Sequence, residues 1–325
     1  MGGALLTGCA GSGMASYPPP PTPVPVPATS PVSPTLPPPA AAAAASPPAA
    51  TIATAGGPAC GVARPAATVR LSGAQSGRTA LLRVPASYDG RHRLPLVVAL
   101  HGYDQTAAGF DAYTGIRAAG AALGAVVAVP QGVGTPPGWD VPDTQELGPR
   151  DTGMLRSLLD VLARTACVDP ARVLLAGLSD GADMAVTAAC VLGPTRVRAV
   201  LLVAASTAPS PRCAAIGVLQ VHGTADPVDA YTGRGVDTRR GFGSVKAAGA
   251  EQAFARWSAL AGCTGRRATD QADLRVLDGT GCRRPVRLVA VQGGGHTWPG
   301  AGPRPSLGAT TRSLDTRALL RDAAR

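Results

Sequence analysis

The first 60 residues of this 325-residue chain contain no Asp, Glu, Lys or Arg, so every charged side chain lies further along. Fourteen of the 32 prolines fall between residues 18 and 48, beside an alanine run at residues 40–45. Such a stretch has too few large apolar side chains to form a core, and it is typical of an extended, polyproline-like linker. Residues 60–325 are sufficient for one substantial globular domain.

Three further scarcities exclude classes of protein. No apolar run reaches the ~18–20 residues that a membrane-spanning helix needs. Aromatic residues make up only 3% of the chain, which leaves few rings for stacking on nucleic-acid bases. The net charge of +10 comes from dispersed arginines, Lys246 being the only lysine. We therefore expect no nucleic-acid partner, and contact with a membrane only through a lipid anchor.

A lipid anchor is suggested by residues 6–9, Leu-Thr-Gly-Cys, which resemble a bacterial lipobox with Cys9 as the acylated residue. A complete secretory leader also has a basic region and an apolar stretch of ~7–15 residues, and too little sequence precedes Cys9 for both. Either the coding region begins further upstream or the match is fortuitous. We expect a partial signal segment at residues 1–9, a disordered Pro/Ala-rich linker at residues 10–59 and a catalytic domain at residues 60–325.

Cysteine usage also favours export from the cytosol. If Cys9 carries lipid, six of the seven cysteines remain: Cys60, Cys167, Cys190, Cys213, Cys263 and Cys282. None lies in a CxxC arrangement, so zinc has little support and we expect no metal. Six cysteines allow 15 pairings. The sequence alone favours only Cys263–Cys282, which flank a loop-like insertion, and buried free thiols are the alternative.

Strand and helix patterns alternate from residue 80 onward. Unbroken apolar runs at Leu94–Leu100 and Leu123–Val129 are typical of buried parallel strands. Further strands are predicted at Arg172–Ala176, Ala199–Ala205, Gly217–His222 and Val286–Val291, and helices at Asp151–Ala166, Ala182–Leu192, Val245–Leu260 and Ser313–Ala323. The pattern predicts an α/β fold whose mostly parallel sheet carries helices on both faces. Active sites in such sheets lie at the carboxyl ends of the strands.

One of these strand ends carries Gly177-Leu178-Ser179-Asp180-Gly181, a GxSxG motif between a predicted strand and a predicted helix. The glycines permit a sharp turn that exposes the serine hydroxyl. The following helix N-terminus offers N–H groups to an oxyanion. Ser179 is therefore the candidate nucleophile.

The chain has four histidines from which a general base can come. His92 lies in a polar loop between arginines, and we expect it to be solvated. His101 precedes Ser179, and we interpret it as a histidine that anchors its loop. In this architecture the order is serine, acid, histidine, so only His222 and His296 are candidates. His296 alone leaves room for a strand-end acid before it.

The acid is expected after the strand Gly217–His222, where Asp226 is the preferred candidate and Asp229 its rival. The loop after Leu94–Leu100 donates an oxyanion-hole amide in this architecture. The expected donors are the backbone N–H groups of Tyr103 and Asp180.

The motifs LVVALHGYDQTAAGFDAYTG, AVPQGVG, CVDPARVLLAGLSDGADMA, VHGTADPVDAY and GGGHTWPG occur in this order. Together they resemble secreted polyhydroxybutyrate depolymerase-like and feruloyl esterase-like hydrolases of the carbohydrate esterase family 1 type. The resemblance implies an α/β-hydrolase fold, no cofactor and ester hydrolysis through an acyl-serine, with a triad of Ser179, Asp226 and His296. It also implies disulfides Cys190–Cys213 and Cys263–Cys282, which leaves Cys60–Cys167.

The turn around Ser179, called the elbow from here on, departs from that family. The family usually has a neutral residue and then Gly-Gly after the serine. Here Asp180 and Ala182 occupy those places. We expect the Asp180 carboxylate to oppose the developing oxyanion, so that removing its charge raises kcat/KM by up to about tenfold. A catalytically weak or silent lipoprotein that binds cell-wall polysaccharide is the alternative function. The main prediction is a monomeric, secreted or surface-anchored serine esterase acting on small or oligomeric esters, including cell-wall or plant polysaccharide esters.

Overall fold

The computed structural model describes residue 60 and residues 63–72, 75–141, 149–237 and 245–325. All belong to one compact unit, Ala49–Arg325; a second unit, Met1–Pro48, lies outside the described residues. Cys9 and the linker at residues 10–59 therefore also lie outside them. Among the described helices, none has both the length and the apolar character needed to cross a bilayer.

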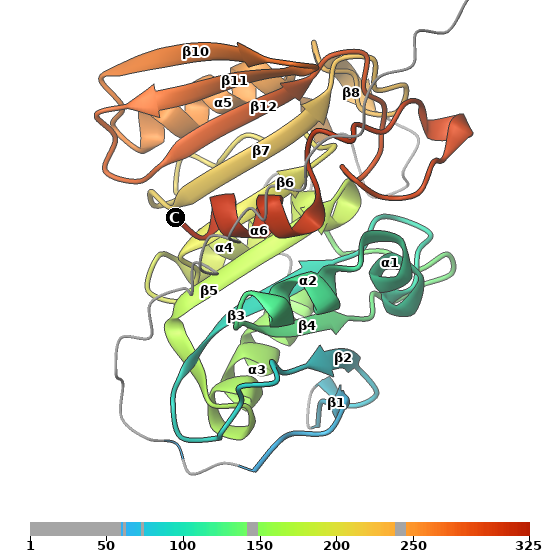
Figure 1. Ribbon diagram of the computed structural model, residues 1–325, viewed down its shortest axis with the longest axis vertical. Helices are drawn as coiled ribbons and strands as arrows, with labels where there is room; N and C mark the ends of the chain where they lie inside the picture. The colour runs from blue at the N-terminus through green and yellow to red at the C-terminus, as the bar shows by residue number, and fades with distance from the viewer. Residues whose placement is uncertain (1–59, 61–62, 73–74, 142–148, 238–244) are drawn as a thin grey trace, which may run out of the picture. The chain divides into compact units, whose positions relative to one another are not determined.

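A ten-stranded sheet organises the domain, in the order β1-β2-β4-β3-β5-β6-β7-β12-β11-β10 (Figure 1). Its strands are β1 (Thr68–Arg70), β2 (Thr79–Arg83), β3 (Leu94–Leu100), β4 (Val126–Pro130), β5 (Val168–Leu178), β6 (Ala199–Val203), β7 (Gly217–Gly223), β10 (Gly265–Gln271), β11 (Leu274–Thr280) and β12 (Val286–Val291). In this sheet order, neighbouring strands from β4 through β3, β5, β6 and β7 to β12 pair in parallel. The edge strands β1 and β2 at one side, and β10 and β11 at the other, pair antiparallel to their neighbours. The carboxyl ends of the central strands therefore meet at one edge.

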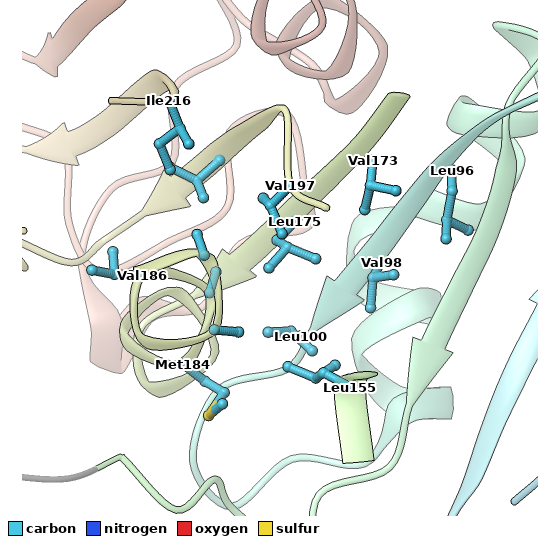
Figure 2. Close-up of a cluster of buried hydrophobic side chains, with 14 of the residues drawn as sticks. Leu96, Val98, Leu100, Leu155, Val173, Leu175, Met184, Val186, Val197 and Ile216 are labelled. Atoms are coloured by element: carbon cyan, nitrogen blue, oxygen red, sulfur yellow. The ribbon is translucent and has the colours of Figure 1, made fainter. Parts of the chain in front are cut away.

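Helices cover both faces of this sheet (Figure 1). One face carries α3 (Pro149–Thr165), α4 (Asp180–Leu192) and α5 (Ala250–Leu260), and the other carries α1 (Ala107–Thr114), α2 (Ile116–Ala122) and α6 (Thr316–Ala323). Successive residues of a strand point to opposite faces, so β3 contributes to both cores. Leu96, Val98 and Leu100 pack with α3 and α4 (Figure 2), whereas Val97 and Ala99 belong to the core on the opposite face.

The predicted α/β fold is confirmed, and β3 and β12 have the predicted bounds. The helix predicted at Val245–Leu260 is wrong in its first turn. Val245–Ala247 is instead strand β9, paired with β8 (Arg234–Asp237), and α5 begins only at Ala250. Gly249 precedes the helix and has a φ of 82°, a value that glycine adopts readily. This residue therefore separates strand β9 from helix α5.

The expectation of a loop-like insertion between Cys263 and Cys282 is also wrong. It is the β10–β11 hairpin, which continues the main sheet beyond β12. Every residue of β10 is exposed, so the strand shows no apolar alternation by which periodicity could identify it. Helices α1 and α2 and strands β1 and β2 were not predicted either, because these elements are short.

Three disulfides join Cys60 to Cys167, Cys190 to Cys213 and Cys263 to Cys282. These are the pairs that the family resemblance implies. The first links the start of the described domain to the residue before β5, and the third closes the base of the β10–β11 hairpin. Disulfides of this kind are typical of proteins that mature outside the reducing cytosol.

Candidate active site

Ser179 forms a sharp turn between β5 and α4, with φ 54° and ψ −122°. A positive φ strains a residue that has a Cβ, and such strain is frequent at functional sites. Two glycines make the turn possible. A Cβ on Gly177 would overlap the Gly181 carbonyl, and a Cβ on Gly181 would overlap the carbonyl oxygens of Leu100 and His101. The start of α4 therefore rests directly on the end of β3.

His296 and Asp226 meet at the same edge of the sheet. Nδ1 of His296 lies 2.8 Å from Oδ2 of Asp226, and the Asp226 side chain is fully buried. The other carboxylate oxygen, Oδ1, accepts hydrogen bonds from the backbone N–H groups of Val228 and Asp229, both at 2.8 Å. Asp226 is thus fixed through Oδ1 and presents Oδ2 to the imidazole.

The two loops that carry this pair are held together by their backbones. The Ala225 N–H donates to the Gly294 carbonyl at 2.9 Å. A Cβ on Gly223 would overlap that same carbonyl, and a Cβ on Gly295 would overlap the Leu307 carbonyl. Gly223 and Gly295 are thus needed for the close approach of the backbones.

Trp298, two residues beyond His296, is fully buried. It fixes the far end of the loop after β12, which carries His296 and is called the histidine loop below. Its indole lies edge-on to Phe110, with ring centroids 5.6 Å apart. Its Nε1–H donates to the Thr316 hydroxyl at 2.9 Å, and its backbone N–H donates to the Tyr113 hydroxyl at 3.1 Å. Helices α1 and α6 therefore both hold the loop that presents His296.

The rival acid, Asp229, has other partners. Its carboxylate accepts hydrogen bonds from the backbone N–H of Ser206 at 2.9 Å and from the Ser206 hydroxyl. Burial raises the pKa of Asp229, the nearby Asp226 carboxylate raises it further, and His222 opposes the shift. The geometry thus pairs His296 with Asp226 and places the Asp229 carboxylate against a different loop.

The other histidines have distinct surroundings. His92 is exposed and pairs with Asp89 at 2.5 Å, as expected of a surface side chain. His101 is fully buried, and its Nδ1–H donates to the Gly102 carbonyl while Nε2 accepts the Gly132 N–H at 2.9 Å. Burial lowers the pKa of His101. These bonds agree with the expected anchoring role, since they hold the loop after β3 against the loop after β4.

The two backbone groups expected to form the oxyanion hole lie on adjacent segments. Tyr103 follows Gly102, whose Cα lies close to the Leu178 carbonyl: a Cβ there would be 3.4 Å from that oxygen. Asp180 is the first residue of α4. The loop after β3 and the start of α4 therefore lie side by side next to Ser179.

The Asp180 carboxylate, which the sequence places beside the oxyanion, has a structural partner. Its Oδ2 accepts the backbone N–H of Trp139 at 3.0 Å, while the Trp139 indole N–H donates to the His101 carbonyl at 2.7 Å. Trp139 thus joins the loop after β4 to the elbow, a role that sequence reasoning missed. The only available signal was a lone tryptophan in the segment PPGWD.

Among the described residues, no group of three or more His, Cys, Asp or Glu side chains could hold a metal ion.

The parallel sheet, the strained Ser179 turn and the Asp226–His296 pair define an α/β hydrolase. No protein-family model matches the sequence. The chain is 31% identical over 277 residues to a Nocardia uniformis subsp. tsuyamanensis protein that carries the name esterase NocK; the match covers 74% of this chain and 78% of that protein.

Feruloyl esterase B of Piromyces equi is 28% identical over 244 residues, which cover 67% of this chain but only 42% of that relative. Among solved structures, acetyl xylan esterase from Aspergillus awamori superimposes with a TM-score of 0.51 at 16% identity, over 68% of this chain and 89% of that one. The chain belongs to the esterase family of α/β hydrolases, and its reaction is the hydrolysis of carboxylic esters.

Proposed function

We propose that the protein is a serine esterase that acts through Ser179, Asp226 and His296 and forms an acyl-enzyme. The observation that carries the proposal is the 2.8 Å bond between His296 Nδ1 and a fully buried Asp226, at the strand-end edge that also carries the strained Ser179. Because Nδ1 is bound to Asp226, Nε2 is the nitrogen left to accept the serine proton.

In the proposed mechanism, Ser179 Oγ attacks the ester carbonyl as His296 Nε2 removes its proton. The backbone N–H groups of Tyr103 and Asp180 stabilise the tetrahedral oxyanion. His296 then protonates the leaving alcohol, and water hydrolyses the acyl-enzyme by the same steps in reverse. Asp226 holds the imidazole and stabilises its charged form during each proton transfer.

Replacement of Ser179 by Ala tests this proposal. We expect kcat for p-nitrophenyl acetate to fall by roughly 10⁴–10⁶ while the domain stays folded. Ser258→Ala, in α5, is the matched control and should retain parental turnover. Near-normal turnover by the Ser179→Ala protein would overturn the triad.

The substrate class is a further part of the proposal. Feruloylated sugars, acetylated sugars and short hydroxyalkanoate oligomers are the candidates. The feruloyl esterase relative supports the first of these. Polysaccharide esters of cell walls or plants are the proposed natural material. A panel of the three ester types, compared by kcat/KM, separates them.

The competing function is a silent α/β-hydrolase domain that binds cell-wall polysaccharide. Asp180 and Ala182 at the elbow favour it, because both differ from the usual residues of the resembled family. A fluorophosphonate probe discriminates between the two functions, since it labels only an activated serine. Absence of labelling on the folded, disulfide-intact protein would favour the binding function.

We also propose a monomer anchored outside the cytosol through lipid on Cys9. The three disulfides support the location, and the lipobox-like residues support the anchor. The intact mass of membrane-extracted protein tests for an acylated Cys9 at the mature N-terminus. An unmodified Met1 in a cytosolic fraction would overturn both statements.

A further inference from the structure

His222, the second-last residue of β7, is a buried titratable side chain that the mechanism above does not use. Its Nε2 lies 2.7 Å from the backbone carbonyl oxygen of Asp229 and 3.5 Å from Oδ2 of Asp226. Two imidazoles therefore face the same carboxylate oxygen: His296 at 2.8 Å and His222 at 3.5 Å.

The contacts of His222 define where its proton lies. A carbonyl oxygen can only accept a hydrogen bond, so Nε2 must carry the hydrogen and donate it to Asp229. Nδ1 is buried and has no hydrogen-bond partner among the described residues. Nδ1 is therefore the nitrogen of His222 left to accept a proton, and it has no contact with the Ser179 hydroxyl within hydrogen-bond distance.

The turn that His222 contacts is the one that orients the acid. Oδ1 of Asp226 is bound to the N–H groups of Val228 and Asp229, so the carboxylate moves with this turn. The carbonyl of Asp229 is in turn bound to β7 through His222. The Tyr231 ring centroid lies 5.9 Å from that of the imidazole, and the Asp229 carboxylate, which is bound to Ser206, interacts electrostatically with His222.

We propose that His222 is a positioning residue for the Asp226–His296 pair. Its Nε2–H fixes the Asp229 carbonyl to the end of β7 and thereby aims Oδ2 of Asp226 at Nδ1 of His296. A lost donor at this point lets the turn shift, and a displacement of about 1 Å at a catalytic group can lower the rate on the order of 10²-fold. The inference rests on the proposed triad.

Three variants test the position of the donor. His222→Gln places an amide N–H close to the position of Nε2, whereas His222→Asn carries the same group on a shorter side chain that cannot reach the Asp229 carbonyl. His222→Leu removes the donor altogether. We expect kcat to fall ~10- to 100-fold in the Asn and Leu proteins and to stay within about threefold of the parent in the Gln protein. KM should change little, because no contact with substrate is lost.

A spectroscopic measurement separates positioning from a loss of stability. The His296 proton shared with Asp226 should give a low-field ¹H NMR resonance, retained in His222→Gln and shifted or broadened in His222→Asn. If the Leu protein does not fold, the Gln and Asn pair still decides the question. Equal kcat values in the Gln and Asn proteins, whether both parental or both reduced, would overturn the inference.

The same series includes Ser179→Ala, which distinguishes a failure of the proposed triad from a failure of the proposed role of His222. If Ser179→Ala retains turnover, the triad itself is wrong. If Ser179→Ala is inactive while His222→Asn has the parental kcat and resonance, only the role of His222 is wrong.

Discussion

The candidate site has two halves, and both use glycines to bring backbone segments close together. The halves differ in how far apart in the sequence their residues lie. The nucleophile half comprises the loops after β3 and β4 and the Ser179 turn; the acid–base half comprises the loops after β7 and β12. Both use glycines for close backbone approach, at Gly181 in the first and Gly295 in the second. The turn that carries the nucleophile consists of five consecutive residues, whereas Asp226 and His296 lie 70 residues apart in the sequence.

The two halves therefore depend on different parts of the fold. The elbow needs β5, α4 and the end of β3, which are central elements with a continuous core. The histidine loop also needs Trp298 to pack between α1 and α6, with a Thr316–Thr114 bond that joins residues 202 positions apart. Damage to the periphery should therefore affect the base before it affects the nucleophile.

The largest expected effect breaks the acid–base half at its centre. Asp226→Asn should lower kcat by roughly 10⁴-fold, because the amide can present an N–H to His296 and favour the wrong tautomer. Asp229→Asn, the matched change at the rival acid, should lower kcat less than tenfold, since its carboxylate binds Ser206. Steady-state kinetics of both proteins decide between them, and the reverse order of losses would make Asp229 the acid.

The second effect tests whether the glycines matter equally in the two halves. Gly181→Ala and Gly295→Ala each force a Cβ into a backbone carbonyl, and each should lower the free energy of unfolding by about 1–3 kcal/mol or more. Gly302→Ala is the control, because a Cβ there meets nothing within 4 Å. Urea midpoints measure the losses. A parental midpoint for either site variant would show that its loop can relax around the added methyl group.

The central strands, and the positions of the candidate residues at their ends, could be predicted from the sequence because they depend on strong local signals. The apolar run Leu94–Leu100 and the GxSxG motif need no distant partner to be recognised. The β10–β11 hairpin was missed because all seven residues of β10 are exposed. Trp139 was missed because its partners, His101 and Asp180, come together only in three dimensions.

A third, smaller effect concerns the charge of Asp180 in the nucleophile half. Asp180→Asn keeps an oxygen acceptor for the Trp139 N–H but removes the negative charge beside the proposed oxyanion. We expect kcat/KM for a simple ester to rise by up to about tenfold and the acidic limb of the pH profile to move to lower pH. Thermal stability should fall slightly, because a carboxylate at a helix N-terminus is favourable.

Asp180→Ala provides the comparison for that variant. It removes both the charge and the acceptor, so the Trp139 loop should loosen and the gain in kcat/KM should be lost. If the Asn protein matches the parent in rate and pH profile, the carboxylate does not influence the oxyanion. A large loss of activity in the Asn protein would instead give Asp180 a positive role in catalysis or substrate binding.

The smallest expected effect is a pH dependence of folding in the nucleophile half. Burial lowers the pKa of His101, while its bond to the Gly102 carbonyl and the Asp151 charge act in the opposite direction. A histidine with a lowered pKa binds its proton more readily in the unfolded chain, so its contribution to stability is present above the unfolded pKa of about 6.5 and is lost as the pH falls through the folded value.

His101→Gln can keep an acceptor for the Gly132 N–H and has no proton to gain. As the pH falls below about 6.5, the parent should lose more unfolding free energy than the variant does. Urea unfolding at a series of pH values measures this, and the raised pKa of Asp229 cancels because it is common to both proteins. Parallel stability curves would show that His101 takes up no more protons on unfolding than glutamine does, and its buried bonds to Gly132 and Gly102 would then be independent of pH in this range.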